Sequence, residues 1–164
     1  MGKDVELARH SGDQDSAWPA DLVRLYDARR TEYVRLAYLL TGHRLVAEEI
    51  VQESFIATRG RWGSVESPPA YVRAAVVNRS KSWLRRRTLE ERHQQPDDRE
   101  IELGADELWD ALRVLTERQR AVVVLRYYSD LGYDTIAEQL GCRPATVRTS
   151  LHRALRRLRR EIER

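Results

Sequence analysis

Arginine dominates the segment from Cys142 to Arg160, which contains seven arginines and no acidic residue. An arginine side chain can donate two hydrogen bonds to a phosphate or to the edge of a guanine, so such a row is suited to binding nucleic acid. At 3.6 residues per turn the segment predicts an amphipathic helix. Its predicted apolar side consists of Val147, Leu151, Ala154, Leu155 and Leu158. The opposite side is almost uniformly cationic, and we expect an anion there.

A helix-turn-helix is predicted around this segment. Tyr133 to Leu140 reads as a short helix, Gly141 to Pro144 as a turn, and the arginine-rich segment as the second helix. Because the amino-terminal half of the second helix enters the major groove of DNA in this motif, we expect base-edge contacts from that half. The predicted base-edge residues are Arg148, Thr149, His152 and Arg153, and the predicted phosphate contacts are Arg143 and Arg156, with Arg159 as a further candidate.

The alternative interpretation of this face is plain solvation. A solvated face usually alternates Glu with Arg, because such i to i+4 pairs stabilise a helix by about 0.2–0.5 kcal/mol each. No acid lies between Arg143 and Arg160, which favours DNA. Arg143 also stands where Ser, Thr or Asp would cap the helix, while Pro144 suits its first position. We interpret Arg143 as a residue for phosphate rather than for capping.

Two further charged surfaces are predicted nearer the amino terminus. The helix that Pro68 opens has six basic residues and no acid between Tyr71 and Arg87. Trp83 lies among them, and aromatic rings beside arginines suit single-stranded nucleic acid, although burial of Trp83 in the core is an equally good interpretation. The preceding helix turns Glu49, Gln52 and Glu53 outward. Carboxylates are repelled by phosphate, so this acidic face predicts either simple solvent exposure or docking of a basic protein.

Composition predicts an all-α fold. The 164 residues are 41% hydrophobic and 34% charged with 8 Gly and 5 Pro, and no alternating strand pattern occurs. The polar, acidic stretch 94–105 is predicted to be a flexible linker. It would join two small helical domains, residues 18–93 and 106–164, after a flexible tail formed by residues 1–17.

Enzymatic chemistry is not predicted. The four histidines are scattered, and the sequence has no metal-ligand spacing, Gly-rich phosphate loop or nucleophile elbow, so we expect no catalytic residue, metal or cofactor.

Cys142 is the single cysteine, which indicates a reducing compartment. No run approaches the roughly 18 apolar residues of a membrane span, and the first residues lack a hydrophobic signal core. We therefore expect a cytoplasmic protein without a membrane partner.

Taken together, these segments resemble a bacterial RNA polymerase sigma factor of the extracytoplasmic-function (ECF) class, of the arginine-rich actinobacterial type. The resemblance covers about residues 20 to 162, and it rests on "RLAYLLTG", "AEEIVQESFIATRGRW", "AYVRAAVVNRSKSWLRRR" and "LTERQRAVVVLRYYSDLGYDTIAEQLGCRPATVRTSLHRALRRLR". It implies a transcription initiation factor whose first domain recognises and melts the −10 element and whose second domain reads the −35 element. Its partners would be core RNA polymerase and promoter DNA in double- and single-stranded form, and an anti-sigma protein is a further candidate.

The resemblance also implies a role for each surface. Glu49, Gln52 and Glu53 would dock on the clamp helices of the polymerase β′ subunit, and the second domain would lie on the β flap. A loop near Thr88 to Arg92 would hold a flipped −10 base. The implied −10 contacts are Asn78, Lys81, Trp83, Arg85, Arg86 and Arg87, and the implied −35 contacts are Arg143, Thr146, Arg148, Thr149, His152, Arg153 and Arg156. His43 and Arg44 depart from the family pattern, in which this turn is usually acidic.

Two other functions fit parts of the pattern. A stand-alone helix-turn-helix repressor or activator, with a first domain that dimerises or senses a ligand, would read an inverted repeat with half-sites about one helical turn apart. A scaffold without a DNA role would function unchanged if Arg153 were replaced by Ala. A sigma factor instead reads two unlike elements and associates with core polymerase.

Overall fold

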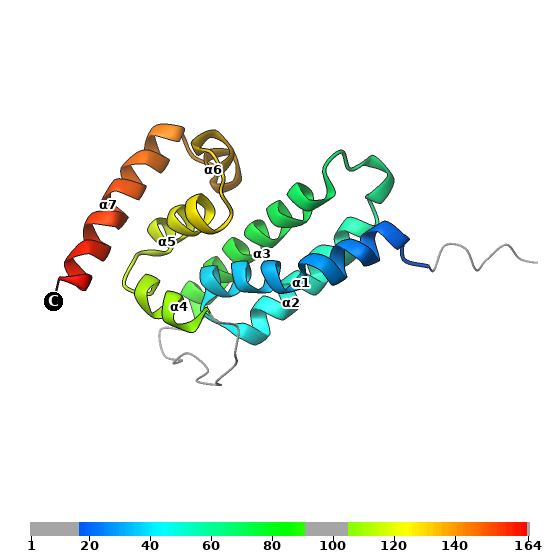
Figure 1. Cartoon of the computed structure of the whole chain (residues 1–164), viewed down its shortest axis with the longest axis horizontal. Helices are drawn as coiled ribbons and strands as arrows, with labels where there is room; N and C mark the ends of the chain where they lie inside the picture. Colours follow the sequence, from blue (N-terminus) through cyan, green and yellow to red (C-terminus); the bar gives the residue numbers. More distant parts are fainter. Residues whose placement is uncertain (1–16, 91–104, 164) are drawn as a thin grey trace, which may run out of the picture.

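A computed structural model describes residues 17–90 and 105–163 of the chain. All regular structure in these two ranges is helical, which confirms the predicted fold class (Figure 1). The predicted tail and linker lie outside the described residues, apart from Ala17 and Ala105. The elements are α1 (Ala20–Thr41), α2 (Arg44–Arg59), η1 (Trp62–Ser64), α3 (Pro68–Glu90), α4 (Asp106–Leu112), α5 (Glu117–Val123), η2 (Val124–Tyr128), α6 (Tyr133–Leu140) and α7 (Pro144–Ile162).

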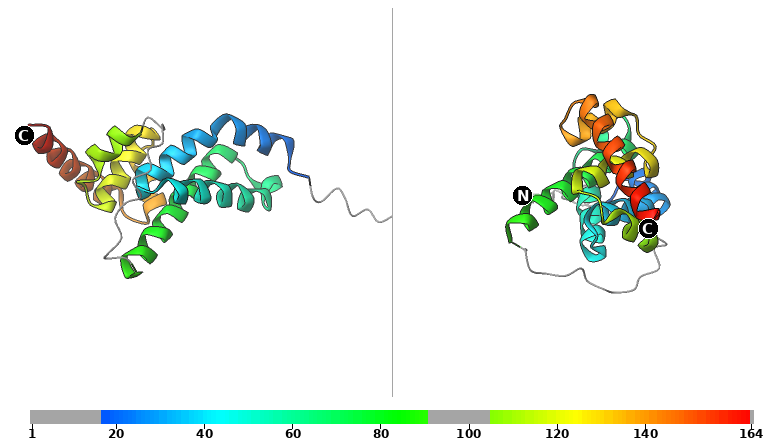
Figure 2. Two further views of the ribbon diagram at one scale, coloured as in Figure 1. Left: turned by 90° about the horizontal axis from the view of Figure 1, so that it is seen from below. Right: turned by 90° about the vertical axis from the view of Figure 1, so that its left-hand side faces the viewer.

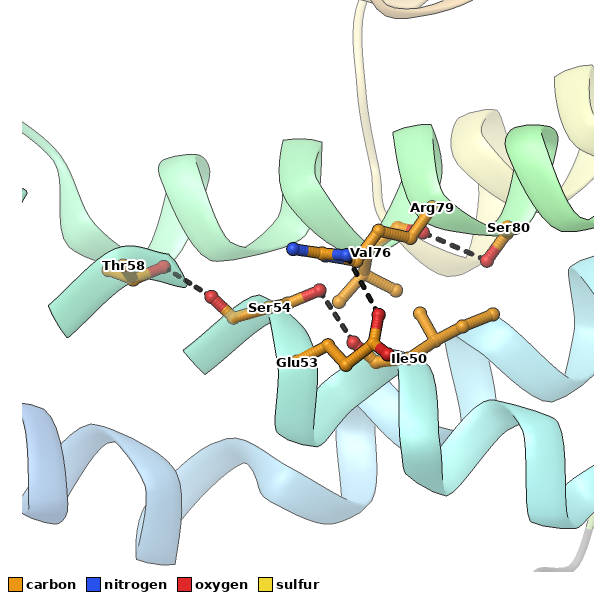
Figure 3. Close-up of polar contacts among 7 residues, drawn as sticks. All are labelled: Ile50, Glu53, Ser54, Thr58, Val76, Arg79 and Ser80. Carbon is orange, nitrogen blue, oxygen red and sulfur yellow. Dashed lines mark hydrogen bonds and ion pairs between the residues drawn. The ribbon is translucent and has the colours of Figure 1, made fainter. Parts of the chain in front are cut away.

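The first helical group consists of α1, α2 and α3, which pack against one another. The ring of Phe55 on α2 lies edge-on to Tyr26 and Tyr33 of α1, with centroids 5.0 and 5.9 Å apart. Ser54, Thr58 and Ser80 are buried where α2 faces α3 (Figure 3). Each hydroxyl donates to the carbonyl four residues earlier in its own helix, so these polar groups are buried without losing a hydrogen bond.

The second helical group consists of α4 to α7, and its turns follow the sequence closely. A capping box starts α5, as the motif "TERQ" at residues 116–119 predicts. Gln119 donates its backbone N–H to the Thr116 hydroxyl, and its side chain accepts from the Thr116 N–H. The helix-turn-helix is also present. α6 ends at Gly141 in the left-handed conformation, and α7 begins at Pro144. Arg143 makes no capping hydrogen bond with its side chain, and its contact with phosphate stays a prediction.

Two details of the second helical group correct the sequence analysis. The segment "ERQRAVVVLRYY", residues 117–128, predicts one continuous α-helix. The structure has an α-helix only to Val123, and the chain continues as the wider π-helix η2. The residues from Ala121 to Leu125 are all apolar and buried, so their pattern carries no period that could fix the helix type. Leu155 is 41% exposed rather than buried. It lies about 80° from Val147 around α7, at the edge of the apolar stripe.

The two helical groups pack directly against each other, which the sequence did not predict. α1 contacts α4, α5 and η2, and α3 contacts α6. Gly42, the left-handed cap that ends α1, lies against the indole ring of Trp109 from α4. The buried residues of both groups form one hydrophobic cluster. Among the described helices, none has the length and apolar character needed to span a bilayer.

Gly42→Ala tests this packing, because a Cβ at residue 42 would overlap the Trp109 ring in a backbone with φ of 75°. We expect a loss of unfolding free energy of about 3 kcal/mol, from left-handed strain and steric overlap together. Gly141→Ala is the matched control, since φ is 64° there but nothing lies within 4 Å of the added Cβ, and it should cost only about 1–2 kcal/mol. Equal losses in urea unfolding would contradict the close approach of Trp109 to Gly42.

Candidate nucleic-acid interface

The arginine-rich helix α7 forms one end of the molecule (Figures 1 and 2). α5 and α6 pack against its inner side, where Val147, Leu151 and Ala154 are buried. These apolar contacts fix the rotation of the helix about its axis. The predicted cationic side therefore faces outward, away from the first helical group.

The predicted −35 residues lie together on this outward side. Six of them are exposed, namely Arg143, Arg148, Thr149, His152, Arg153 and Arg156, and Thr146 is half-buried. The Thr149 hydroxyl donates to the Ala145 carbonyl at 3.0 Å, which leaves its oxygen able to accept a hydrogen bond. Further along α7, Arg153 and Arg156 line an open groove of about 620 Å³ with Gln119 of α5. The helix thus presents a continuous basic surface to solvent.

Tyr133, the first residue of α6, was not predicted as part of this surface. The guanidinium groups of Arg148 and Arg126 lie 5.4 and 5.5 Å from the centre of its ring. Arg126 is itself held by donation to the Leu131 carbonyl at 2.9 Å. Cation–π contacts of this kind orient an arginine without neutralising its charge, so Tyr133 positions Arg148 at the start of the basic face. The contact depends on the angle between α6 and α7, and residue spacing along one helix carries no signal for it.

The predicted −10 residues of α3 differ in their surroundings. Asn78, Arg85 and Arg86 are exposed, whereas Lys81, Trp83 and Arg87 are half-buried. The Trp83 ring packs on the hydrophobic core and on the His43 ring, at a centroid distance of 4.9 Å. The Arg87 guanidinium lies 5.2 Å from the centre of the Trp83 ring and also contacts His43. In this arrangement Trp83 serves the packing of α3, and its contact with DNA stays a prediction.

The loop predicted at Thr88 to Arg92 is wrong in its first part, because α3 continues as a helix to Glu90. No glycine or proline interrupts residues 84–90, and most of them are Leu, Arg or Glu, which are good helix formers. Residues 91 and 92 lie outside the described residues. The end of α3 projects away from the other helices (Figure 2).

Lys81 contacts the second helical group. Its ammonium donates to the carbonyl of Gln139 on α6 at 2.9 Å. Burial, and then the nearby charge of Arg85, lower the pKa of Lys81 below its usual range. Lys81 is therefore shared between the predicted −10 surface and the packing of the two groups.

The acidic face on α2 is exposed as predicted, at Glu49, Gln52 and Glu53. Two large apolar residues on the same face were missed, Leu45 and Ile56, which are 61% and 59% exposed. Their spacing from Glu49, Gln52 and Glu53 follows helical periodicity, so this signal was present in the sequence. Exposed apolar groups on either side of a charged patch are typical of a surface that docks another protein.

An apolar crevice of about 310 Å³ extends this face toward α1 and is lined in part by Gln52, Ile56, Trp18 and Val23. On its other side the face meets α3, where Glu53 pairs with Arg79 at 2.8 Å (Figure 3). The acidic face is thus directly continuous with the basic surface of α3.

Within residues 17–90 and 105–163, no group of three or more His, Cys, Asp or Glu is placed to hold a metal ion.

Comparison with known proteins assigns the family. Residues 105–158 match the family described as Sigma-70, region 4. The chain is 39% identical over 150 residues to the RNA polymerase sigma-E factor of Streptomyces avermitilis, with 80% of this chain and 84% of that protein covered. It is 31% identical to the ECF RNA polymerase sigma factor SigL of Mycobacterium tuberculosis, with 96% and 97% covered. The chain belongs to the ECF RNA polymerase sigma factors.

A solved structure supports the fold of this sigma factor. The sigma factor RpoE from Bartonella quintana, crystallised with the anti-sigma factor NepR, superposes with a TM-score of 0.69 at 21% identity. The match covers 87% of this chain and 97% of that chain, so it includes helices of both groups. Family and fold confirm the predicted resemblance, and sigma factors are transcription initiation factors rather than enzymes in the usual sense. The roles of individual residues stay predictions.

The Glu53–Arg79 pair of this sigma factor should contribute little to stability. Both side chains are more than a third exposed, and exposed pairs are typically worth less than about 1 kcal/mol. We expect a double-mutant cycle of Glu53→Gln and Arg79→Met, followed by urea unfolding, to give a coupling free energy below about 1 kcal/mol. A coupling well above about 2 kcal/mol would show that Glu53 is committed to Arg79 and is not readily available to a partner.

Proposed function

We propose that this sigma factor directs core RNA polymerase to promoters by reading the −35 element with α7 and the −10 element with α3. One observation carries the proposal. The whole outward side of the second helix of a helix-turn-helix is cationic and exposed, and no acid interrupts it before Glu161. We take residues 18–93 and 106–164 as the two promoter-reading domains.

On α7 the position of each residue along the helix determines whether we propose a base contact or a phosphate contact. Arg148, Thr149, His152 and Arg153 lie in the half of the helix that enters the major groove, where arginine can bind guanine through two hydrogen bonds. Thr146, half-buried beside them, supports the start of this surface. Arg143 and Arg156 flank the half-helix and suit phosphates. Phosphate contacts release counterions, so they supply affinity and salt dependence rather than sequence preference.

On α3 the proposed contacts are to the non-template strand of the −10 region. Asn78, Arg85 and Arg86 are exposed on the part of the helix that leads to its projecting end (Figure 2). Lys81 and Arg87 add positive charge to this surface, and Trp83 would offer a ring for base stacking once its neighbours move. Single-stranded DNA fits such a surface because its bases are free to stack.

The proposed polymerase contact is the face of α2. Glu49, Gln52 and Glu53 supply negative charge, and Leu45 and Ile56 supply apolar area that water would otherwise cover. A basic helical partner, the clamp helices of β′, suits this combination. The second domain is proposed to lie on the β flap. An anti-sigma protein is a further candidate partner, since RpoE of B. quintana was solved with NepR. We place this activity in the cytoplasm, without catalytic residues, metal or cofactor.

Arg153→Ala is the most direct test of −35 reading. In transcription with core polymerase, on a promoter selected from a library, the variant should lose about 1–3 kcal/mol of preference for the intact over the scrambled −35 element. Activity on the scrambled element should stay the same, because only base reading is removed. Arg113→Ala is the control, because it removes the same charge from the exposed residue that follows α4 and pairs with Asp110.

Two results would reject this proposal. In the first, the wild-type protein transcribes equally well from intact and scrambled −35 elements. In the second, the protein does not associate with purified core polymerase but binds an inverted repeat tightly by itself. The second result would favour a dimeric helix-turn-helix regulator.

Glu49→Arg tests the docking face. We expect the charge reversal to weaken binding to core polymerase about tenfold or more, since a rim charge that meets a like charge costs at least about 1.4 kcal/mol. Glu66→Arg makes the same change at an exposed residue between η1 and α3, and it should leave the affinity unchanged. Fluorescence anisotropy with labelled sigma factor measures both. An equal loss in the two variants would point to net charge rather than to the α2 face.

A further inference from the structure

Most of the predicted −10 residues divide between two sides of α3. Lys81 and Arg85 line a crevice together with residues of α5 and α6, whereas Trp83, Arg86 and Arg87 line a groove between α3 and α2. At about 100° per residue, these two sets point in nearly opposite directions around the helix. One DNA strand that follows α3 can therefore place a given base on only one of the two sides.

The groove on the α2 side has an acidic wall and a basic wall. Its volume is about 480 Å³, which lies within the range of about 300–1,000 Å³ that ligand sites occupy. The α2 wall carries Glu49 and Glu53, and the α3 wall carries Arg79 and Arg86. The acidic wall repels a phosphate and the basic wall attracts it. A nucleotide would thus lie in one orientation, with its phosphate on α3 and its base toward α2.

Glu53 is held in this groove by Arg79. Its carboxylate accepts from the Arg79 guanidinium at 2.8 Å, so the side chain extends from α2 toward α3 (Figure 3). A carboxylate has about four acceptor positions, and this bond leaves Glu53 able to accept further hydrogen bonds. The positive charge of Arg79 also reduces the repulsion between Glu53 and an approaching phosphate.

The groove also has a flat surface on which a base can stack. The Trp83 ring lines the groove, and the Arg87 guanidinium lies 5.2 Å from the centre of that ring. Bases that are free of a duplex stack on aromatic rings and on the planes of arginine guanidinium groups. The groove thus combines a stacking surface, a wall for phosphate and a hydrogen-bond acceptor, which are the kinds of group that bind a nucleotide.

We propose that this groove is a nucleobase site, which takes one unpaired guanine of the non-template −10 strand with Glu53 as the residue that reads it. The guanine ring stacks on Trp83 and Arg87, and its phosphate binds Arg86. Guanine suits a carboxylate best, because its N1–H and N2–H groups are adjacent donors that both carboxylate oxygens can accept. On the same edge the other three bases present an acceptor beside their donor, which a carboxylate repels. The inference rests on the proposed function of α3.

The nucleobase site gives Glu53 a role different from that of Glu49 and Gln52, which remain on the docking face of α2. A carboxylate beside DNA is unfavourable when a phosphate approaches it and favourable when the N–H edge of a base does. An acid at the border of the −10 surface therefore supplies base preference, while the arginines around it supply affinity.

The test uses complexes of core polymerase, the full-chain sigma factor and DNA duplexes premelted across the −10 region. Each unpaired non-template position is varied in turn, and competition binding gives the preference for guanine as a ratio of affinities. A loss of polymerase docking lowers the affinity for every duplex alike, so it cancels in this ratio. The variants are Glu53→Ala and, as the matched control on the same helix, Glu48→Ala, whose carboxylate pairs instead with Arg44 at 3.2 Å.

We expect the wild type to prefer guanine about five- to 150-fold at one unpaired position, which is the range for a bidentate contact with a base. Glu53→Ala should abolish this preference and leave the preferences at other positions unchanged, and Glu48→Ala should change none. Inosine, which lacks the N2 amino group, should bind the wild type at least about fivefold more weakly than guanine at that position. Glu53→Ala should bind inosine and guanine equally.

Two results would overturn the nucleobase site while −10 reading itself stands. In the first, the wild type prefers other bases in the −10 region but guanine at no unpaired position. In the second, Glu53→Ala keeps the preference for guanine over inosine. Failure of the proposed function looks different, because the wild type would then show no base preference at any position of the −10 region.

Discussion

Arg120 lies where the carbonyl end of α1 meets α4 and α5, and its position determines how the two basic helices are related in space. The guanidinium completes the hydrogen bonding of a helix in one group from a side chain in the other. Trp109 covers that guanidinium and lies against Gly42, so the turn between α1 and α2 is fitted to the same contact. The orientation of the second helical group, and with it that of α7, follows from these few residues.

In this sigma factor the basic and acidic side chains lie on different helices. Each charged surface therefore suits a partner of the opposite charge. α7 is cationic on its solvent side, α3 is cationic toward its projecting end, and α2 is acidic between two exposed apolar residues. Like charges gathered on one helix face repel each other, which costs stability unless a partner of opposite sign is bound. The protein therefore holds in its free state an electrostatic strain that DNA and a basic protein surface would relieve.

Much of the fold could be predicted because residues close together in the sequence determine where helices begin, end and turn their buried side. The buried stripe of α2, the capping box at Thr116 and the left-handed glycines at 42 and 141 all follow from patterns within a few residues. The exposed arginines of α7 followed from the same periodicity. Features that depend on how helices meet could not be predicted in this way. The packing of Tyr133 under Arg148 and the pair of Glu53 with Arg79 join residues of different helices.

The arginine face of α7 is proposed to lie on promoter DNA in the polymerase complex. The most direct measurement is photocrosslinking from a benzophenone on Arg160→Cys, an exposed position on that face, in a Cys142→Ser background. The assembled complex of core polymerase, sigma factor and promoter DNA is irradiated, and the crosslinked positions are mapped. If the arginine face of α7 lies on DNA, we expect crosslinks to DNA at or next to the −35 element. Crosslinks confined to polymerase subunits, or none at all in a transcriptionally active complex, would contradict it.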